Sequence, residues 1–244
     1  MIKKFGTAVI SSPPVLGLLA HDLRWTMAGL LATGDLRASE IVARTGQPPS
    51  LVSYHLGRLR EAGLVSVRRS TADGRDSYYA LDLDAVARTV GEAVATIHPG
   101  LPGAEPPALH PARVLFICSG NSARSPMAEG WLNHLGGGLV TARSAGVTPG
   151  SLHPLAVAAM AEHGIDIAGH RPTPVTDVAA EDFTRVITLC DRARENCGDL
   201  PAVHWSIPNP AQAHPPDLDA FRATARELRT RIRYLLPTLA APAS

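Results

Sequence analysis

The stretch Arg113-Val-Leu-Phe-Ile-Cys118, continued by Ser-Gly-Asn-Ser-Ala-Arg124-Ser125, decides how the C-terminal half of this chain folds. Its first six residues are almost uniformly apolar, which is typical of a buried strand. A short polar loop follows, and a helical pattern then runs from Met127 to Leu135. Strand, tight loop and helix in this order predict an α/β unit whose ligands bind at the carboxyl end of the strand.

The same alternation continues towards the end of the chain. Further strands are expected at residues 139–145 and 185–190, and further helices at 155–163 and 217–236. This order predicts an α/β C-terminal domain built on a parallel sheet. Cys118 and Cys190 both fall at the carboxyl end of an expected strand, which is where such sheets bind ligands.

The loop after Cys118 has the composition of an anion site. Backbone N–H groups of a tight loop at a helix N-terminus converge on one point and attract an oxyanion. Arg124 adds a planar guanidinium that grips two oxygens of a tetrahedral anion. The positive surroundings favour the thiolate of Cys118 as a nucleophile, and Ser125 can donate a hydrogen bond to it. The residues expected to bind the oxyanion are Ser119, Gly120, Asn121, Ser122, Ala123 and Arg124.

A Cys-x5-Arg spacing by itself is a weak signal. The alternative is a buried structural cysteine before a turn. The preceding strand, the following helix, and Gly120, Asn121 and Ser125 between them favour the oxyanion site.

The N-terminal half carries a different pattern. Apolar residues recur at helical spacing in residues 15–19, 23–31, 38–44 and 50–62. Two β-rich runs, 64–69 and 77–81, then flank an Asp-Gly turn, which is a hairpin signal. A last helix is expected at 83–97. Helices followed by a hairpin predict an α+β winged helix-turn-helix domain.

The second helix of the predicted helix-turn-helix would enter the DNA groove. Ser50 is placed to cap it, while Leu51, Val52, Leu56 and Leu59 are expected to face the core. Arginines on the hairpin would contact the DNA backbone. The alternative is a helical interaction domain whose arginines are solvated. The expected DNA contacts are Ser50, Ser53, Tyr54, His55, Arg58, Arg60, Arg68, Arg69 and Arg75.

Composition and linker signals place these two patterns in separate domains. A segment rich in proline and glycine predicts a semi-rigid linker at 98–111, between a DNA-binding domain at 1–97 and a second domain at 112–244. The net charge of +1 requires any DNA contact to be a local basic patch. No secretory signal or membrane-length apolar run is evident, so we expect a cytoplasmic protein without membrane contact. The ten histidines form no ligand-spaced cluster, so no metal is expected.

The N-terminal half resembles ArsR-type repressors. The resemblance covers about residues 14–83 and is carried by Ser53-Tyr-His-Leu and Leu59-Arg-Glu-Ala-Gly-Leu-Val65. It implies operator DNA as a partner and a homodimer formed through the winged-helix domain. Many arsenic-sensing members bind As(III) through cysteines in this domain. This half has no cysteine, so an inducer site of that kind is absent or unrecognisable.

The C-terminal half, about residues 113–236, resembles low-molecular-weight tyrosine phosphatases and the thioredoxin-coupled arsenate reductases that share their fold. The run Arg124-Ser-Pro-Met-Ala-Glu-Gly130 carries the first resemblance. Cys190 and Cys197, with Ser144-Ala-Gly146 and His204-Trp205, carry the second. It implies that Cys118 attacks arsenate, that Cys190 and Cys197 complete a thiol relay, and that thioredoxin or a similar dithiol reduces the protein, with no bound cofactor.

Three features qualify the resemblance. The family's general-acid Asp is replaced by Asn209, and an amide cannot donate a proton as an acid. A potassium site of some relatives matches Asn121, Glu129 and Ser144, but Thr173 replaces its Asp. A straight helix would hold residues 190 and 197 about 10 Å apart, beyond the roughly 7 Å that a disulfide tolerates, so this polar segment is expected to unwind during turnover.

A tyrosine phosphatase and a non-enzymatic sensor of arsenate or redox state remain alternatives.

Overall fold

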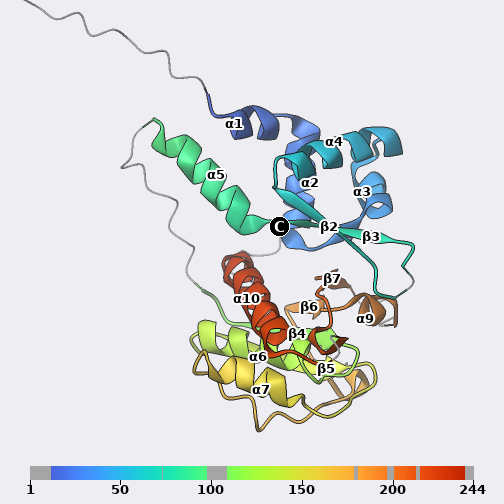
Figure 1. The fold of residues 1–244 in the computed structure, drawn as a ribbon, viewed down its shortest axis with the longest axis vertical. Helices are drawn as coiled ribbons and strands as arrows, with labels where there is room; N and C mark the ends of the chain where they lie inside the picture. The colour runs from blue at the N-terminus through green and yellow to red at the C-terminus, as the bar shows by residue number, and fades with distance from the viewer. Residues whose placement is uncertain are drawn as a thin grey trace, which may run out of the picture.

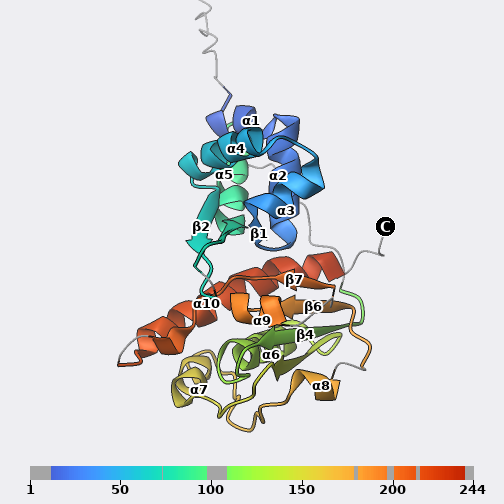
Figure 2. The same ribbon diagram turned by 90° about the vertical axis from the view of Figure 1, so that its right-hand side faces the viewer.

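The computed structural model describes residues 12–72, 74–97, 109–178, 181–196, 201–212 and 215–239. Figures 1 and 2 both show a helical N-terminal half with a hairpin, lying beside an α/β C-terminal half. Most of the predicted linker, residues 98–108, lies outside the described residues, so the domain boundaries stay a prediction. Among the helices that the structure describes, none is long and apolar enough to cross a membrane.

The N-terminal half is a winged helix-turn-helix, as predicted. Its three strands form an antiparallel sheet in the order β1-β3-β2, and Val65 of β2 lies opposite Leu81 of β3. We call the β2–β3 hairpin, with the residues between its strands, the wing. In chain order the elements are α1 (Pro14–Leu19), α2 (Asp22–Thr33), β1 (Leu36–Arg37), α3 (Ala38–Thr45), α4 (Pro49–Glu61), β2 (Val65–Arg69), β3 (Ser77–Leu81) and α5 (Leu83–Ala95).

Local sequence explains the turn between α3 and α4. Gly46 adopts a left-handed φ of 66° and ends α3, while Pro49 occupies the first turn of α4. Pro48 is the N-cap residue, so the expected cap by Ser50 is wrong. The predicted core residues Val52, Leu56 and Leu59 are buried, but Leu51 is 38% exposed and does not face the core.

The C-terminal half contains the expected parallel sheet, with strand order β5-β4-β6-β7. Cys118 lies opposite Gly146 in the register, and Ile117 lies opposite Thr188, so β4, β5 and β6 end at the same edge. The elements are β4 (Ala112–Cys118), α6 (Arg124–Leu135), β5 (Val140–Gly146), α7 (Pro154–Ala161), α8 (Val175–Val178), β6 (Arg185–Thr188), α9 (Asp191–Asn196), β7 (Ala202–His204) and α10 (Leu218–Leu235), with 3-10 turns at Pro210–Gln212 and Leu236–Leu239.

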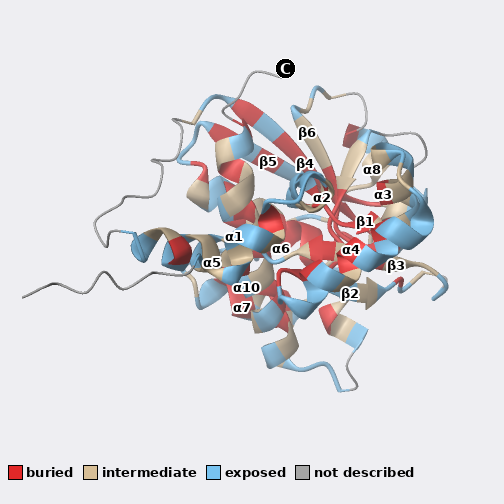
Figure 3. Cartoon of the chain, turned by 90° about the horizontal axis from the view of Figure 1, so that it is seen from above, coloured by how far each residue is buried: buried red, intermediate tan, exposed pale blue. Residues whose placement is uncertain are grey.

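Each half has its own apolar core. Figure 3 shows buried residues concentrated on the central strands and the inner sides of the helices. In the C-terminal half, Phe116 of β4, Leu132 of α6 and Phe221 of α10 are fully buried. The N-terminal core is separate and centres on Met27 and Ile41. The described residues therefore pack into two separate apolar cores.

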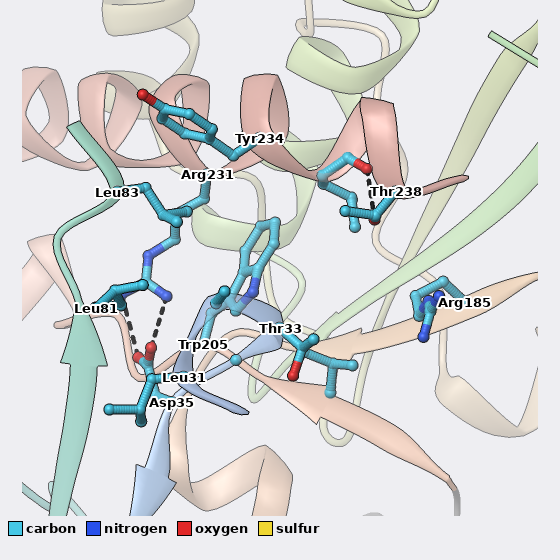
Figure 4. A pocket seen from close by; sticks show the side chains of 14 residues that line it. Leu31, Thr33, Asp35, Leu81, Leu83, Arg185, Trp205, Arg231, Tyr234 and Thr238 are labelled. Carbon is cyan, nitrogen blue, oxygen red and sulfur yellow. Dashed lines mark hydrogen bonds and ion pairs between the residues drawn. The ribbon is translucent and has the colours of Figure 1, made fainter. Parts of the chain in front are cut away.

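The two halves are joined by buried polar contacts. Arg231 of α10 donates hydrogen bonds of 2.8 and 3.1 Å to the carboxylate of Asp35. The backbone N–H of Ser206 donates to the same carboxylate at 2.7 Å, and the N–H of Asp35 donates to the carbonyl of His204 at 2.7 Å. Figure 4 shows this pair beside Trp205, in a cavity of about 90 Å³ between the halves.

Candidate oxyanion and thiol site

The loop at the end of β4, residues 118–125, is held in a conformation that turns it back on itself. Asn121 has a φ of 47°, a left-handed value that a non-glycine residue adopts at a cost. Gly146, at the end of β5, packs directly beneath it. A Cβ added to Gly146 would lie 2.8 Å from the Asn121 nitrogen, so only glycine permits this approach.

Hydrogen bonds from Asn121 offset that cost and orient Ser125. The Asn121 Oδ1 accepts from the backbone N–H of Thr173 at 2.8 Å, which places its Nδ2 on the opposite side. The Nδ2 donates to the Oγ of Ser125 at 3.0 Å. The Ser125 hydroxyl hydrogen therefore remains for the Cys118 sulfur at 3.0 Å, with the Ala145 carbonyl a more distant acceptor at 3.4 Å. This geometry places a hydroxyl donor on the Cys118 sulfur.

The residues that match the potassium site of some relatives form a hydrogen-bonded network. Asn121 Nδ2 donates to Ser144 Oγ at 2.8 Å, and Ser144 donates to Glu129 at 2.6 Å. His170 Nε2 lies 3.2 Å from Asn121 Oδ1. Burial lowers the pKa of His170, against the opposing effect of Glu129. Within the described ranges, no group of three or more His, Cys, Asp or Glu is placed to hold a metal.

A cavity of about 260 Å³ opens above the loop. Arg124 is buried and lines it, and its guanidinium also donates to the Ile207 carbonyl at 3.0 Å. Asn209 lines the same cavity, and its Oδ1 accepts the Ala211 N–H at 3.3 Å, so its side chain caps the following turn. The predicted oxyanion residues that line the cavity are Ser119, Gly120, Ser122, Ala123 and Arg124.

Cys190 belongs to this cavity as well. Its sulfur is buried and lies 3.1 Å from the Oγ of Ser119, a residue of the Cys118 loop. The structure therefore brings Cys118 and Cys190 to one cavity. Cys197, the third predicted thiol, lies outside the described residues.

Asp191 follows Cys190 and is fully buried. Burial by itself raises the pKa of this carboxyl, but hydrogen bonds from His204, Thr71 and Ser206 outweigh burial and hold the pKa well below its usual range. His204, quoted in the resemblance, thus serves to fix Asp191, at 3.1 Å.

Sequence reasoning missed four residues that line the cavity. Arg192 of α9, with Ala211 and Gln212 of the 3-10 turn, comes from the C-terminal half, but Thr71 comes from the wing. Proximity to Cys190 could have suggested Arg192. No local sequence signal connects Thr71 with residues 120 positions away.

The predicted DNA contacts are mostly exposed on α4 and the wing. The prediction is wrong for His55, which is only 3% exposed and packs against His21 and Arg24. Burial lowers the pKa of His55. It faces inward because it lies three residues after the core residue Val52 and four before the core residue Leu59, and residues at these spacings share one face of a helix. Arg68 contacts Glu227 of α10 at 3.6 Å. The exposed ones are Ser50, Ser53, Tyr54, Arg58, Arg60, Arg69 and Arg75.

We expect Gly146→Ala to damage the oxyanion loop. The new methyl group would push against the Asn121 backbone, so the loop must shift, at a cost of about 1–3 kcal/mol in unfolding free energy. Phosphate binding, measured by calorimetry, should weaken together with stability, measured by urea unfolding. Gly150→Ala is the matched control, because its Cβ would meet only the Gly120 carbonyl at 4.0 Å. Equal phosphate affinity in the two variants would contradict the packing argument.

Both halves of the chain resemble known proteins. Residues 113–243 match the family described as low molecular weight phosphotyrosine protein phosphatase, and residues 29–67 match the arsR family of bacterial regulatory proteins. A glutaredoxin arsenate reductase of Synechocystis is 37% identical over 130 residues, covering 51% of this chain and 95% of the relative. An arsenate reductase of Staphylococcus aureus is 40% identical over 102 residues, covering 40% and 78%. A solved arsenate reductase in a phosphate-binding state is 33% identical, covers 52% of this chain and 98% of its own, and has a TM-score of 0.46.

Proposed function

This chain belongs to the low molecular weight phosphotyrosine protein phosphatase family and carries an ArsR-family helix-turn-helix segment, and from that premise we propose a bifunctional protein. The C-terminal half reduces arsenate to arsenite by a relay of three cysteines. The N-terminal half binds operator DNA as a transcriptional regulator and forms the homodimer that a symmetric operator requires.

The observation that carries the reductase proposal is the pairing of two thiols in one cavity. A phosphatase needs one nucleophile and an anion cradle, which Cys118 and Arg124 supply. The cavity also holds a second buried thiol, Cys190, whose sulfur lies against the same loop at Ser119. A redox relay needs such a thiol and phosphate hydrolysis does not.

The proposed relay begins at Cys118. The Cys118 thiolate attacks As(V) of bound arsenate, a sulfur–arsenic bond forms, and one arsenate oxygen leaves as water after protonation. The Cys190 thiolate then attacks the Cys118 sulfur. The sulfur–arsenic bond breaks, its electron pair stays on arsenic, and As(III) leaves as arsenite, so that a Cys118–Cys190 disulfide remains.

Cys197 regenerates the nucleophile. Its thiolate attacks Cys190, releases the Cys118 thiolate and leaves a Cys190–Cys197 disulfide. A dithiol partner of the thioredoxin type supplies the two electrons that reduce this disulfide. Asn209 cannot act as a general acid for the departing oxygen, so the first step runs without that assistance, which is worth roughly 10²–10⁴-fold where it operates.

Thiol variants test the relay. With thioredoxin and its reductase present, the wild type should form arsenite continuously. Cys190→Ser should form none, because nothing displaces arsenic from Cys118. Cys197→Ser should form about one equivalent and stop with a Cys118–Cys190 disulfide, which mass spectrometry would detect.

Two other outcomes would identify the alternatives. Hydrolysis of p-nitrophenyl phosphate that persists in Cys190→Ser, without any arsenate reduction by the wild type, would indicate a phosphatase. Phosphate and arsenate binding without either turnover, together with DNA binding that responds to arsenate, would indicate a sensor.

A further inference from the structure

The wing of the DNA-binding half reaches the thiol cavity. Figures 1 and 2 show the loop between β2 and β3 extending towards α9, the helix that follows Cys190. Thr71 in this loop donates two hydrogen bonds to the Oδ2 of Asp191, from its backbone N–H at 2.6 Å and from its hydroxyl at 2.9 Å. Thr71 also lines the cavity that holds Cys118 and Cys190.

The two oxygens of the Asp191 carboxylate accept hydrogen bonds from different halves of the chain. Its Oδ1 accepts from the Ser206 hydroxyl at 2.7 Å and from His204 Nε2 at 3.1 Å, both in the C-terminal half. Its Oδ2 accepts from Thr71. The low pKa of Asp191 keeps this carboxylate ionised, and hydrogen bonds to a charged group are the stronger kind.

This carboxylate lies at the start of α9, directly after Cys190. The Arg194 N–H donates to the Cys190 carbonyl at 3.0 Å, so Cys190 is tied to the first turn of the helix. The Arg194 side chain in turn donates to Glu40 of α3 at 2.6 Å. The DNA-binding half thus holds this turn at two points. A movement of this turn would therefore carry Cys190 with it.

We propose that the wing contributes to the thiol site. Thr71 is a positioning residue, which holds Cys190 at the cavity wall through its hydrogen bonds to Asp191. This inference rests on the proposed function, because it gives the position of Cys190 a role in the relay. The inference also implies that DNA and Asp191 compete for the wing. The wing cannot hold Asp191 and lie along a DNA backbone at once, so DNA bound at the wing would release Cys190.

A negative charge introduced at the contact tests this. Thr71→Glu places a carboxylate against Asp191 and should undock the wing. Ser66→Glu is the matched control, since it adds the same charge to an exposed position of the same hairpin. Thr71→Val, which keeps the backbone donor and loses only the hydroxyl, is the mild variant. The readout is the rate at which neutral iodoacetamide alkylates each cysteine in the reduced full-length protein, resolved by peptide mass mapping.

We expect alkylation of Cys190 to accelerate about tenfold in Thr71→Glu, to rise less in Thr71→Val, and to stay unchanged in Ser66→Glu. A nearby negative charge disfavours a thiolate, so any direct electrostatic effect of the new glutamate would act in the opposite direction. Cys118, held by Ser125, should not accelerate. Equal Cys190 rates in the wild type and Thr71→Glu would overturn the proposal.

Duplex DNA tests the competition. A random-sequence duplex at low ionic strength binds through phosphate contacts, and its binding can be followed by anisotropy in the same sample. Bound duplex should accelerate Cys190 alkylation in the wild type, and an unchanged rate would overturn the competition. These readouts need no arsenate. A wild type that reduces no arsenate would therefore overturn the proposed function, while the alkylation rates still decide the role of the wing.

Discussion

Arg124→Lys is expected to lower kcat/KM for arsenate by about 10²–10³-fold, the loss that follows removal of one oxyanion donor from a preorganised site. The Arg124 guanidinium lines the cavity and also donates to the Ile207 carbonyl at 3.0 Å. A planar fork can hold a protein carbonyl and an oxyanion together, whereas an ammonium is a single point of charge. A lysine at position 124 can therefore bind the Ile207 carbonyl or the oxyanion, but not both. Steady-state arsenate reduction and phosphate affinity measure the two consequences.

Arg192→Lys is the matched control for this substitution. Arg192 lines the same cavity but is exposed, so solvent screens its charge and water replaces its contacts. Its replacement should change kcat/KM little. A loss in Arg124→Lys as small as that in Arg192→Lys would mean that positive charge alone, and not the bidentate geometry of Arg124, binds the anion.

The parts of this protein that follow from local patterns could be predicted from its sequence. The strand before Cys118, the loop to Ser125, and the hairpin of the wing all carry their signals within short segments, the longest of which is the hairpin formed by Val65–Arg69 and Ser77–Leu81. The strands β1 and β7, with two and three residues, carry no periodic signal and were missed. His55 was misplaced because polar residues at helical spacing were all assigned to solvent, whereas the structure buries this one against His21.

Contacts between the halves could not be predicted at all. The pairing of Thr71 with Asp191 joins residues 120 positions apart, and that of Asp35 with Arg231 spans 196. Neither end of such a pair differs locally from an ordinary surface residue, since only the docking of two folded units buries it. The predicted linker between the halves also argued for independent domains. The arrangement of the halves is a property of tertiary packing, and no single segment encodes it.

Arg231→Met is expected to cost about 3–5 kcal/mol in unfolding free energy, because it leaves the Asp35 carboxylate buried with no opposite charge. Asp35 is only 2% exposed, and Arg231 supplies two of its hydrogen bonds. The Ser206 N–H remains as a donor, but a single neutral hydrogen bond does not compensate a buried charge. Urea unfolding followed by tryptophan fluorescence measures the loss, with Trp25 in the N-terminal half and Trp205 at the contact.

Arg222→Met is the control for that variant, because Arg222 lies on the same helix and pairs with Glu162 and Asp219 at the surface. Exposed pairs of this kind contribute little, so its effect should be a small part of the loss in Arg231→Met. Adding Asp35→Asn to Arg231→Met removes the unpaired carboxylate and should recover part of the lost unfolding free energy. The recovered part measures the cost of the unpaired carboxylate, and the remainder measures the cost of lost packing. Losses as small as that of Arg222→Met, with no recovery in the double variant, would mean that this pair does not hold the two halves together. Docking of the wing would then depend on the remaining contacts between the halves, among them Arg194 with Glu40, and would become an equilibrium that DNA could shift with less binding energy.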